Sequence, residues 1–403
     1  MKKVFLTTIA LLSMASASVF GMYGVNSGDW IGFLTHGNQF RARMGQLGFT
    51  LGNDTIKGTF GFFNNGRGAY GSMLSQSTAA GESGTGLYYD FTPTISMGLA
   101  YTSSLISVGV GYNATIGPRW NRYNNKTEPK KVEAVVHTPV LVLNALDNAF
   151  RMAIPIQVVN LTDKFDGVGK GSITAVSLDA QFRYFTGLDF LPQIRLLIKY
   201  GNYGMQLSPE GGQKEKVTFA ESFGFEFRLY FGAMVEEVAL QPYIKLVYNG
   251  ALGKQHSKTS VTALNALDDS ARFMGELTSF MANPGSAGSG STTTPTTTYG
   301  ENATWKKSAW DLTLAPTLGI TANSDIVSLY VEPSLGLTIT QSGSATDNKV
   351  KELYSLYWGA YAEIYITPIK NLEWYFEANV SRDTVAPVSL AASTGITWYL
   401  PAL

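Results

Sequence analysis

The sequence predicts an all-β protein, a transmembrane antiparallel β-barrel of about 14 strands preceded by an N-terminal amphipathic helix. Three features support this prediction: a two-residue alternation of apolar and polar side chains, connections that are short and long in turn, and a signal-like N-terminus. The alternation is clearest between Leu353 and Leu400, where it occurs in three successive runs. These runs reach the roughly 9 to 11 residues that a tilted strand needs to cross a bilayer. We therefore expect one face of each strand to meet lipid and the other to meet water.

The first 21 residues have the composition of a secretory signal peptide. Lys2 and Lys3 precede an apolar stretch, and cleavage fits after either Ala17 or Gly21. The chain has no cysteine, which excludes lipoprotein anchoring and disulfides. No later segment has 18 uninterrupted apolar residues, which excludes a helical membrane protein. The expected location is the outer membrane of a diderm bacterium, with loops exposed at the cell surface.

The overall composition is compatible with one large membrane barrel. Lys and Arg total 30, and Asp and Glu also total 30, so nothing indicates nucleic acid or an anionic surface as a partner. The 42 glycines and 12% aromatic residues suit curved sheet and aromatic belts at the membrane interfaces. A secreted β-sandwich or β-helix would also be rich in glycine and strands, and composition alone leaves that alternative open.

Residues 22–48 form the expected N-terminal helical segment. Apolar residues recur every three or four positions between Asp29 and Leu47, which predicts an amphipathic helix. Its polar face carries Arg41 and Arg43. The helix is expected to lie in the barrel lumen or at its periplasmic mouth, and the sharper alternative is a constriction with both arginines projecting into a pore.

From Phe49 to Leu403 the chain is predicted to form the barrel, with short and long connections in strict alternation. That asymmetry is typical of bacterial outer-membrane barrels, whereas a sandwich or β-helix has no reason for it. The short connections are predicted at Thr102–Ser104, Ala145–Asn148, Gly187–Leu191, Ala233–Glu236, Ala322–Asp325 and Pro368–Lys370. The long ones are predicted at Asn64–Gly84, Gly117–Lys131, Leu161–Gly171, Met205–Glu215, Gly250–Thr304 and Gln341–Glu352.

The strand number depends on the first part of the barrel. Counting back from the C-terminus gives about 14 strands if Phe49–Phe63 is one irregular strand, and one more if Asn53-Asp54 is a hairpin turn. Because single-chain barrels close with an even number of strands, the alternative is 16, with part of Asp29–Leu47 also in a strand. The helical periodicity of that segment favours 14.

The connection Gly250–Thr304 is longer than a chain reversal needs. Its first half has helical spacing, and Gly285–Tyr299 is a low-complexity Gly/Ser/Thr/Pro run. We interpret it as an exposed surface epitope. The alternatives are a loop that folds into the pore and a tolerated insertion.

Charged residues in the predicted strands fall on one face of the pleat. A charge on the lipid face near the midplane would cost about 2 to 4 kcal/mol, so this face is expected to line a wet interior. With the two helix arginines, the pore-lining candidates are Arg41, Arg43, Arg151, Asp179, Arg183, Arg195, Lys199, Glu226, Arg228, Glu237, Lys245, Asp311, Glu332, Glu363, Glu373 and Glu377.

No catalytic, cofactor or metal site is expected. The three histidines, His36, His137 and His256, are assigned to the helix, a strand and a loop, so local spacing does not bring them together. There is no Gly-x-Ser-x-Gly motif, phosphate loop or metal-spaced cluster. We therefore predict that the protein is not an enzyme.

The N-terminal block resembles the variable surface proteins of intestinal spirochaetes of the Brachyspira type. The segments that carry the resemblance are Phe20–Gly24, Asp29–Ile31, Phe33–Met44 and Gln46–Phe49. The resemblance implies an abundant outer-membrane surface antigen whose copies vary in their exposed parts and assemble into homo- or hetero-oligomers. It supplies no catalytic residues.

The leading prediction is a general diffusion porin that also serves as a variable surface antigen. The alternative is a non-conducting barrel with a structural or adhesive role in a surface layer. The expected partners are outer-membrane lipid, related surface proteins and host antibodies at the exposed loops, without nucleic acid.

Overall fold

The computed structural model describes residues 23–43, 46–64, 76–78, 87–89, 93–122, 130–165, 169–209, 215–235, 238–252, 307–343, 351–382 and 388–400. The predicted signal peptide lies outside these residues, as does nearly all of the predicted long connection 250–304.

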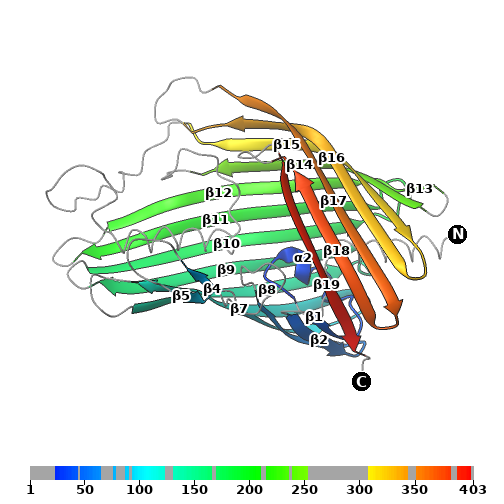
Figure 1. Ribbon diagram of the computed structural model, residues 1–403, viewed down its shortest axis with the longest axis horizontal. Coiled ribbons are helices and arrows are strands. Elements are labelled where there is room, and N and C mark those ends of the chain that lie inside the picture. Colours follow the sequence, from blue (N-terminus) through cyan, green and yellow to red (C-terminus); the bar gives the residue numbers. More distant parts are fainter. Residues whose placement is uncertain are drawn as a thin grey trace.

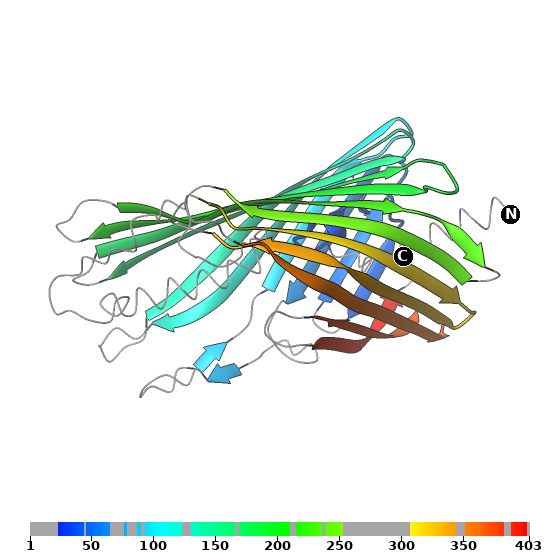
Figure 2. The same cartoon turned by 90° about the horizontal axis from the view of Figure 1, so that it is seen from above.

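In this part of the chain, one antiparallel sheet closes into a barrel (Figures 1 and 2). The last strand, β19, pairs with the first, β1, which closes the ring. The short strand β13 continues β12 along the same neighbour, β14, so the described ring has 16 strand positions. Its strands are β1 (Gln39–Arg43), β2 (Gln46–Gly52), β3 (Ile56–Asn64), β6 (Pro93–Tyr101), β7 (Ile106–Arg122), β8 (Lys130–Ala145), β9 (Phe150–Phe165), β10 (Gly169–Phe185), β11 (Gln193–Pro209), β12 (Glu215–Tyr230), β13 (Ala233–Val235), β14 (Val238–Ala251), β15 (Trp310–Asn323), β16 (Val327–Gln341), β17 (Leu353–Ile369), β18 (Leu372–Ser381) and β19 (Ser389–Leu400). A separate pair joins β4 (Gln76–Thr78) to β5 (Leu87–Tyr89).

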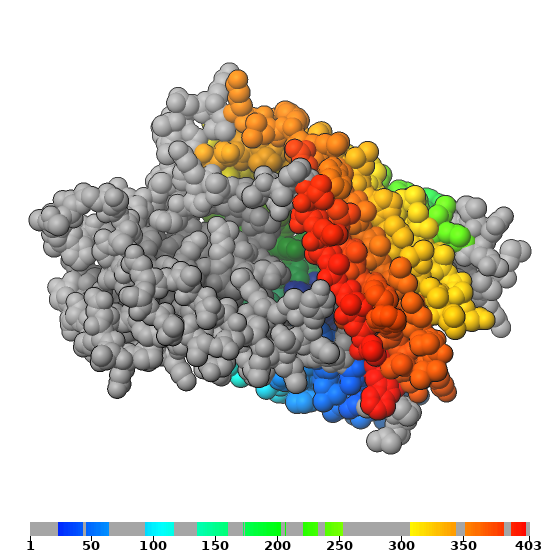
Figure 3. Space-filling model, in the orientation of Figure 1, coloured from blue at the N-terminus to red at the C-terminus, as the bar shows by residue number. Residues whose placement is uncertain are grey.

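The strands of the barrel alternate between an outer apolar face and an inner face. On β6, Met97 and Leu99 are exposed, whereas Ser96 and Ala100 are buried. On β19, Ile396 and Trp398 are exposed, and Thr397 between them is fully buried. Exposed apolar side chains on most of the barrel strands form the belt expected of a lipid-facing surface. Figure 3 shows β19 as a continuous stripe beside β18 on one side of this surface.

The prediction of 14 strands is wrong, and the alternative of 16 is confirmed. Two local features add the extra strands. The Asn53 side chain accepts hydrogen bonds from the backbone N–H groups of Thr55 and Ile56, at 2.9 and 2.8 Å, and so stabilises a turn between β2 and β3. The segment Gln39–Arg43 forms β1, which pairs on both sides and closes the ring. Without β1, the two edges of the sheet would carry unpaired backbone groups inside a membrane.

The predicted amphipathic helix over Asp29–Leu47 is also wrong. Helix α2 covers only Ser27–Trp30, and turns continue the chain to Thr35. The helical spacing of apolar residues is real, but Phe40 belongs to strand β1 and Leu47 to strand β2. There the backbone pairing that closes the barrel outweighs a local helical preference.

The barrel has one tall side and one short side. Strands β7 to β12 have 16 or 17 residues each, whereas β2, β3 and β6 have 7 to 9. A strand of 17 residues spans about 55 Å, roughly twice an apolar belt of about 25 Å. These strands therefore project beyond the belt, and Figures 1 and 2 show them extending well past β18 and β19 at one end of the barrel. The described parts of the predicted long connections Gly117–Lys131, Leu161–Gly171 and Met205–Glu215 are consequently strand, since backbone pairing continues past the apolar pattern. The predicted short connection Ala233–Glu236 is likewise corrected, because Ala233–Val235 forms β13.

The apolar core lies inside the barrel rather than between two layers of structure. The chain before β1 folds into the lumen, where α2 is visible in Figure 1. We call residues Tyr23–Asn38 the inner segment. Its buried residues pack against β6, β8 and β9 in a cluster made of Tyr23, Trp30, Ile31, Phe33, Leu34, Ala100, Val140, Val142 and Ala153.

Candidate functional site in the barrel interior

The inner segment rests on a floor of small residues in β6 and β7. Gly98 and Gly111 face each other across this strand pair, and Trp30 lies over both. A Cβ atom on Gly111 would come within 2.3 Å of the Trp30 ring, and one on Gly98 within 2.9 Å. The next pair, Gly109 and Ala100, lies below Phe33 and Leu34. The absence of side chains at these positions therefore creates the space for the aromatic cluster.

Polar side chains of the barrel bind the backbone of the inner segment. The Lys57 ammonium donates to the carbonyl oxygens of Leu34 and His36, at 2.8 and 2.7 Å. The Asn113 amide donates to Gly24 O. On the other side, Asp179 accepts from both N and Oγ of Ser27, at 3.2 and 3.1 Å. Because buried backbone groups require partners, these contacts fix the position of a segment that has little regular structure of its own.

Titratable groups of the inner segment are shifted by burial. Burial raises the pKa of Asp29 to about 6, and the nearby Asp179 carboxylate adds to the shift. Burial lowers the pKa of His36 to about 3, and Arg41 has the largest effect of several cations that act in the same direction. Nδ1 of the neutral His36 ring is hydrogen-bonded to the Tyr23 hydroxyl, at 2.7 Å. His36 is therefore a structural group that stays neutral at physiological pH.

Five basic residues stand in register across five consecutive strands of the wall, in a set that we call the cation row. Arg183 of β10 faces Arg151 on β9 and Arg195 on β11. Arg195 in turn faces Arg228 on β12, and Arg228 faces Lys245 on β14. Like charges directly opposite each other on a sheet are destabilising, so this arrangement is unfavourable for folding alone.

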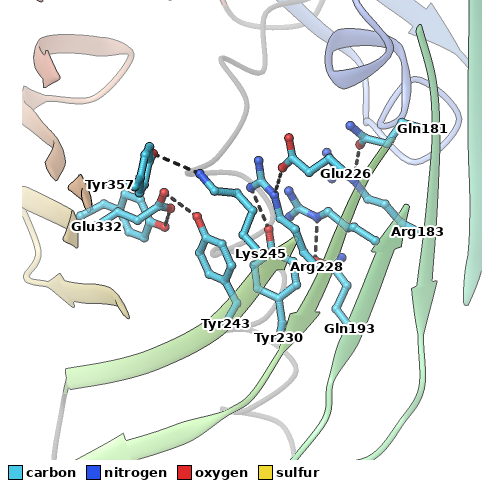
Figure 4. Close-up of polar contacts among 12 residues, drawn as sticks. Gln181, Arg183, Gln193, Glu226, Arg228, Tyr230, Tyr243, Lys245, Glu332 and Tyr357 are labelled. Carbon is cyan, nitrogen blue, oxygen red and sulfur yellow. Dashed lines mark hydrogen bonds and ion pairs between the residues drawn. The ribbon is translucent and has the colours of Figure 1, made fainter. Parts of the chain in front are cut away.

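The guanidinium groups of the cation row are held by a repeated local motif. Arg183 Nε donates to Gln181 at 2.6 Å, and Arg195 Nε donates to Gln193 at 2.9 Å (Figure 4). Arg228 Nε forms an ion pair with Glu226 in the same way. Each acceptor lies two residues before its arginine on the same strand, and therefore on the same face of the sheet.

Aromatic rings pack against the cations of the row. The guanidinium carbon of Arg195 lies 4.7 Å from the Tyr230 ring centroid, and Lys245 Nζ lies 5.1 Å from that of Tyr357. Lys245 also donates to the Tyr357 hydroxyl at 3.3 Å. This last contact runs from β14 to β17, and it is sterically feasible because β15 presents the small residue Ala315 at that level.

Acidic residues occupy a different arc of the wall, on β16 to β18. Glu332 accepts from the Tyr243 hydroxyl of β14 at 2.6 Å, and Glu363 accepts from Tyr361. Glu363 and Glu377 face each other across β17 and β18. The interior thus has a basic arc from β9 to β14 and an acidic arc from β16 to β18.

The remaining predicted pore-lining residues are more scattered. Lys199 faces Asp179 across β10 and β11, Asp311 accepts from Asn249 at 3.0 Å, and Glu373 accepts from Tyr399 at 3.0 Å. Arg41 lies in β1 rather than in a helix, with its guanidinium carbon 4.2 Å from the Tyr399 ring centroid. Only the backbone of Arg43 is described, in β1, and Glu237 lies outside the described residues. That any of these residues lines a conducting pore stays a prediction.

Sequence reasoning missed the groups that organise this interior. Lys57 and the glycines of β6 and β7 carry no signal that distinguishes them from other barrel residues. One signal was usable, because an amide or acidic residue two positions before an arginine recurs near the ends of three strands that adjoin short turns. The three instances are Gln181-x-Arg183, Gln193-x-Arg195 and Glu226-x-Arg228. Among the described residues, no group of acidic residues and histidines has the arrangement of a metal site. No helix in the described part of the chain is long and apolar enough to span a bilayer.

Comparison with known proteins gives one extensive match. The family described as "Serpulina hyodysenteriae variable surface protein" matches residues 2–399. No curated protein matches the sequence. Among solved structures, the chain is similar to "Copper transporter OprC" with 9% identity and a TM-score of 0.37, covering 90% of this chain and 64% of that one. It is also similar to "the Beta Domain of the Bordetella Autotransporter Brka" with 11% identity and a TM-score of 0.28, covering 72% of this chain and 97% of that one.

Proposed function

The chain belongs to the Serpulina hyodysenteriae variable surface protein family, and from this premise we propose that it is an outer-membrane surface barrel that conducts small hydrophilic solutes. The observation that carries the proposal is the charged inner face of a closed 16-strand ring. Charges kept away from water are costly, so basic and acidic arcs on the concave face of a barrel favour a hydrated interior. A barrel of this strand number is wide enough for an aqueous passage unless it is plugged.

Buried polar atoms on the inner face support the same proposal. Several of these atoms have no hydrogen-bond partner among the described residues, including Asn113 Oδ1, Thr138 Oγ1, Thr317 Oγ1 and Thr321 Oγ1. Such groups are rarely left unsatisfied in proteins, so water is the natural partner for an inner face of this kind.

The inner segment favours a second candidate function. Tyr23–Asn38 fills part of the lumen with a packed apolar cluster, which is the arrangement expected of a plugged barrel. In that case the protein would serve as a structural or adhesive component of the surface layer. The two candidates share the same lipid face and differ in whether solute passes the inner segment.

Planar-bilayer recording of the purified, folded protein tests the proposal. Stepwise currents are expected from the wild-type barrel, and a larger step is expected when Trp30→Ala loosens the inner segment. A folded barrel that stays silent in both forms would reject the pore and leave the structural role. Heat-modifiable mobility on gels establishes folding in each case.

Surface exposure is a separate part of the proposal. The family membership supports a role as a surface antigen, with antibodies and related surface proteins as expected partners. Intact cells treated with a nonspecific protease should yield two fragments cut between Phe280 and Trp305, a region outside the described residues. Complete protection of that region on intact cells would contradict exposure there.

A further inference from the structure

We propose that the cation row is a binding site for small oxyanions, with inorganic phosphate as the simplest member of the class. The centre of the site is Arg183 and Arg195, and Arg228 and Lys245 extend it along the wall (Figure 4). If the barrel conducts, the same site makes its permeation selective for anions. This selectivity rests on the proposed pore, but the binding of an anion does not.

The first argument is the charge that remains uncompensated. Within the described part of the chain, the only ion pair of the cation row joins Arg228 to Glu226. Arg151, Arg183, Arg195 and Lys245 have no carboxylate within ion-pair distance among those residues. Among the described residues, tyrosines rather than ion pairs link the row to the acidic arc. Lys245 donates to Tyr357, and Tyr243, whose ring packs against Arg228, donates to Glu332. A row of adjacent cations on one wall therefore presents a strong positive potential to a mobile anion.

The second argument is the orientation of the guanidinium groups. Arg183 and Arg195 each use Nε to bind a glutamine on their own strand. Their terminal amino groups have no acceptor among the described residues, which leaves four N–H donors on each arginine. A planar guanidinium with its Nε fixed presents the paired donors that match carboxylate, phosphate or sulfate oxygens.

The third argument is the burial of Arg183 within the row. The Arg183 residue is 4% exposed, and the Arg228 side chain is 24% exposed. Among the described residues, no terminal nitrogen of Arg183 or Arg195 is both fully buried and without a partner, so these free donors reach the lumen. A charge held this deep in the wall gains from an anionic partner, because it is poorly solvated. An anion that enters from the Arg228 side would satisfy Arg183 and Arg195 together.

Other basic residues of the interior do not have this combination. Arg151 already donates to the Thr35 hydroxyl of the inner segment, at 3.2 Å, and to the backbone of its own turn. Lys57 donates to two backbone carbonyls. Lys199 faces Asp179 rather than another cation. The site is therefore specific to the middle of the row, where like charges meet and donors remain.

Isothermal titration of the folded, detergent-solubilised barrel with inorganic phosphate tests the site. Saturable binding to the wild-type protein is expected. Replacing both central arginines, R183Q with R195Q, should weaken it roughly 100-fold, because each lost set of charge-assisted hydrogen bonds is worth about a factor of ten. K199Q removes one positive charge from β11, the strand that carries Arg195, but at a position outside the row, and should leave phosphate binding unchanged.

A conservative variant separates the binding geometry from charge alone. R195K keeps the charge but loses the planar donor pair, so it should weaken phosphate binding while preserving anion selectivity in a conducting barrel. It also serves as the test if the double variant does not fold. In a salt gradient, the double variant R183Q with R195Q should shift the reversal potential in the direction that indicates cation selectivity.

The outcomes distinguish this inference from the proposed pore. A silent barrel that still binds phosphate, and loses it with R183Q and R195Q, rejects the pore and supports the site. A conducting barrel without saturable phosphate binding, or with equal affinity in the double variant and in K199Q, overturns the site and leaves the pore.

Discussion

Replacing Gly111 by alanine should loosen the inner segment without disturbing the barrel around it. The added Cβ would lie 2.3, 2.4 and 2.7 Å from three atoms of the Trp30 ring, far inside van der Waals contact. Trp30 is fully buried, so its ring has no free space to move into. Overpacking a tight site costs typically about 1 to 3 kcal/mol, and three simultaneous contacts place this site near the upper limit. A cost of about 3 kcal/mol raises the undocked fraction of the segment roughly 100-fold.

The assay uses one reporter thiol. The sequence has no cysteine, so Ile31→Cys introduces a single thiol at a buried position of the inner segment. Its rate of labelling by a maleimide, with the barrel folded, measures the fraction of time that the segment is undocked. Gly98→Ala, with its nearest contact at 2.9 Å, should give an intermediate rate. Gly58→Ala is the control, because its Cβ meets nothing closer than 3.9 Å.

Equal labelling rates for the Gly111, Gly98 and Gly58 variants would refute this reasoning. That result would mean that the glycine floor does not position Trp30. Loss of the folded barrel in the Gly111 variant, judged by heat-modifiable mobility, would show instead that the inner segment and the barrel fold as one cooperative unit.

Three further predictions use the same framework. Burial raises the pKa of Asp29 to about 6, so its contribution to docking is present below about pH 4 and is lost as pH rises from about 4 to 6. Burial lowers the pKa of His36 from 6.5 to about 3, so its contribution is present above about pH 6.5 and is lost as pH falls from there to about 3. The Asp29→Asn variant keeps His36, so its labelling rate, normalised to that of a free thiol, should increase toward low pH. The His36→Gln variant keeps Asp29, so its normalised rate should increase as pH rises to 6. The same pH profile in both variants would contradict the assignment of these effects to the two residues. Lys57→Met removes two charge-assisted hydrogen bonds and should speed labelling about tenfold, and an unchanged rate would show that the aromatic cluster alone holds the segment. Phe225→Arg places a charge on the lipid face and should block insertion, whereas Arg228→Ala on the inner face should leave assembly intact; equal heat-modifiable mobility of the two would show that the faces are assigned wrongly.

The sequence by itself determined most of the strands, and which residues of each strand face lipid and which face the interior. The alternation at Ile396, Thr397 and Trp398 appears directly as exposed, buried and exposed side chains. This information is local, because successive residues of a strand point to opposite faces wherever the strand lies. The N-terminal residues also carried enough similarity to indicate the surface protein family that matches residues 2–399.

Only the tertiary structure decided how the ring closes and which inner residues meet. Gln39–Arg43 becomes a strand because β2 and β19 supply partners on both sides, and no local pattern contains that fact. The cation row depends on register across five strands, which the lengths of the intervening turns set. Arg183 and Arg228 are 45 positions apart in the sequence, yet each faces Arg195. Periodicity could place these side chains on the inner face, but only strand pairing could place them side by side.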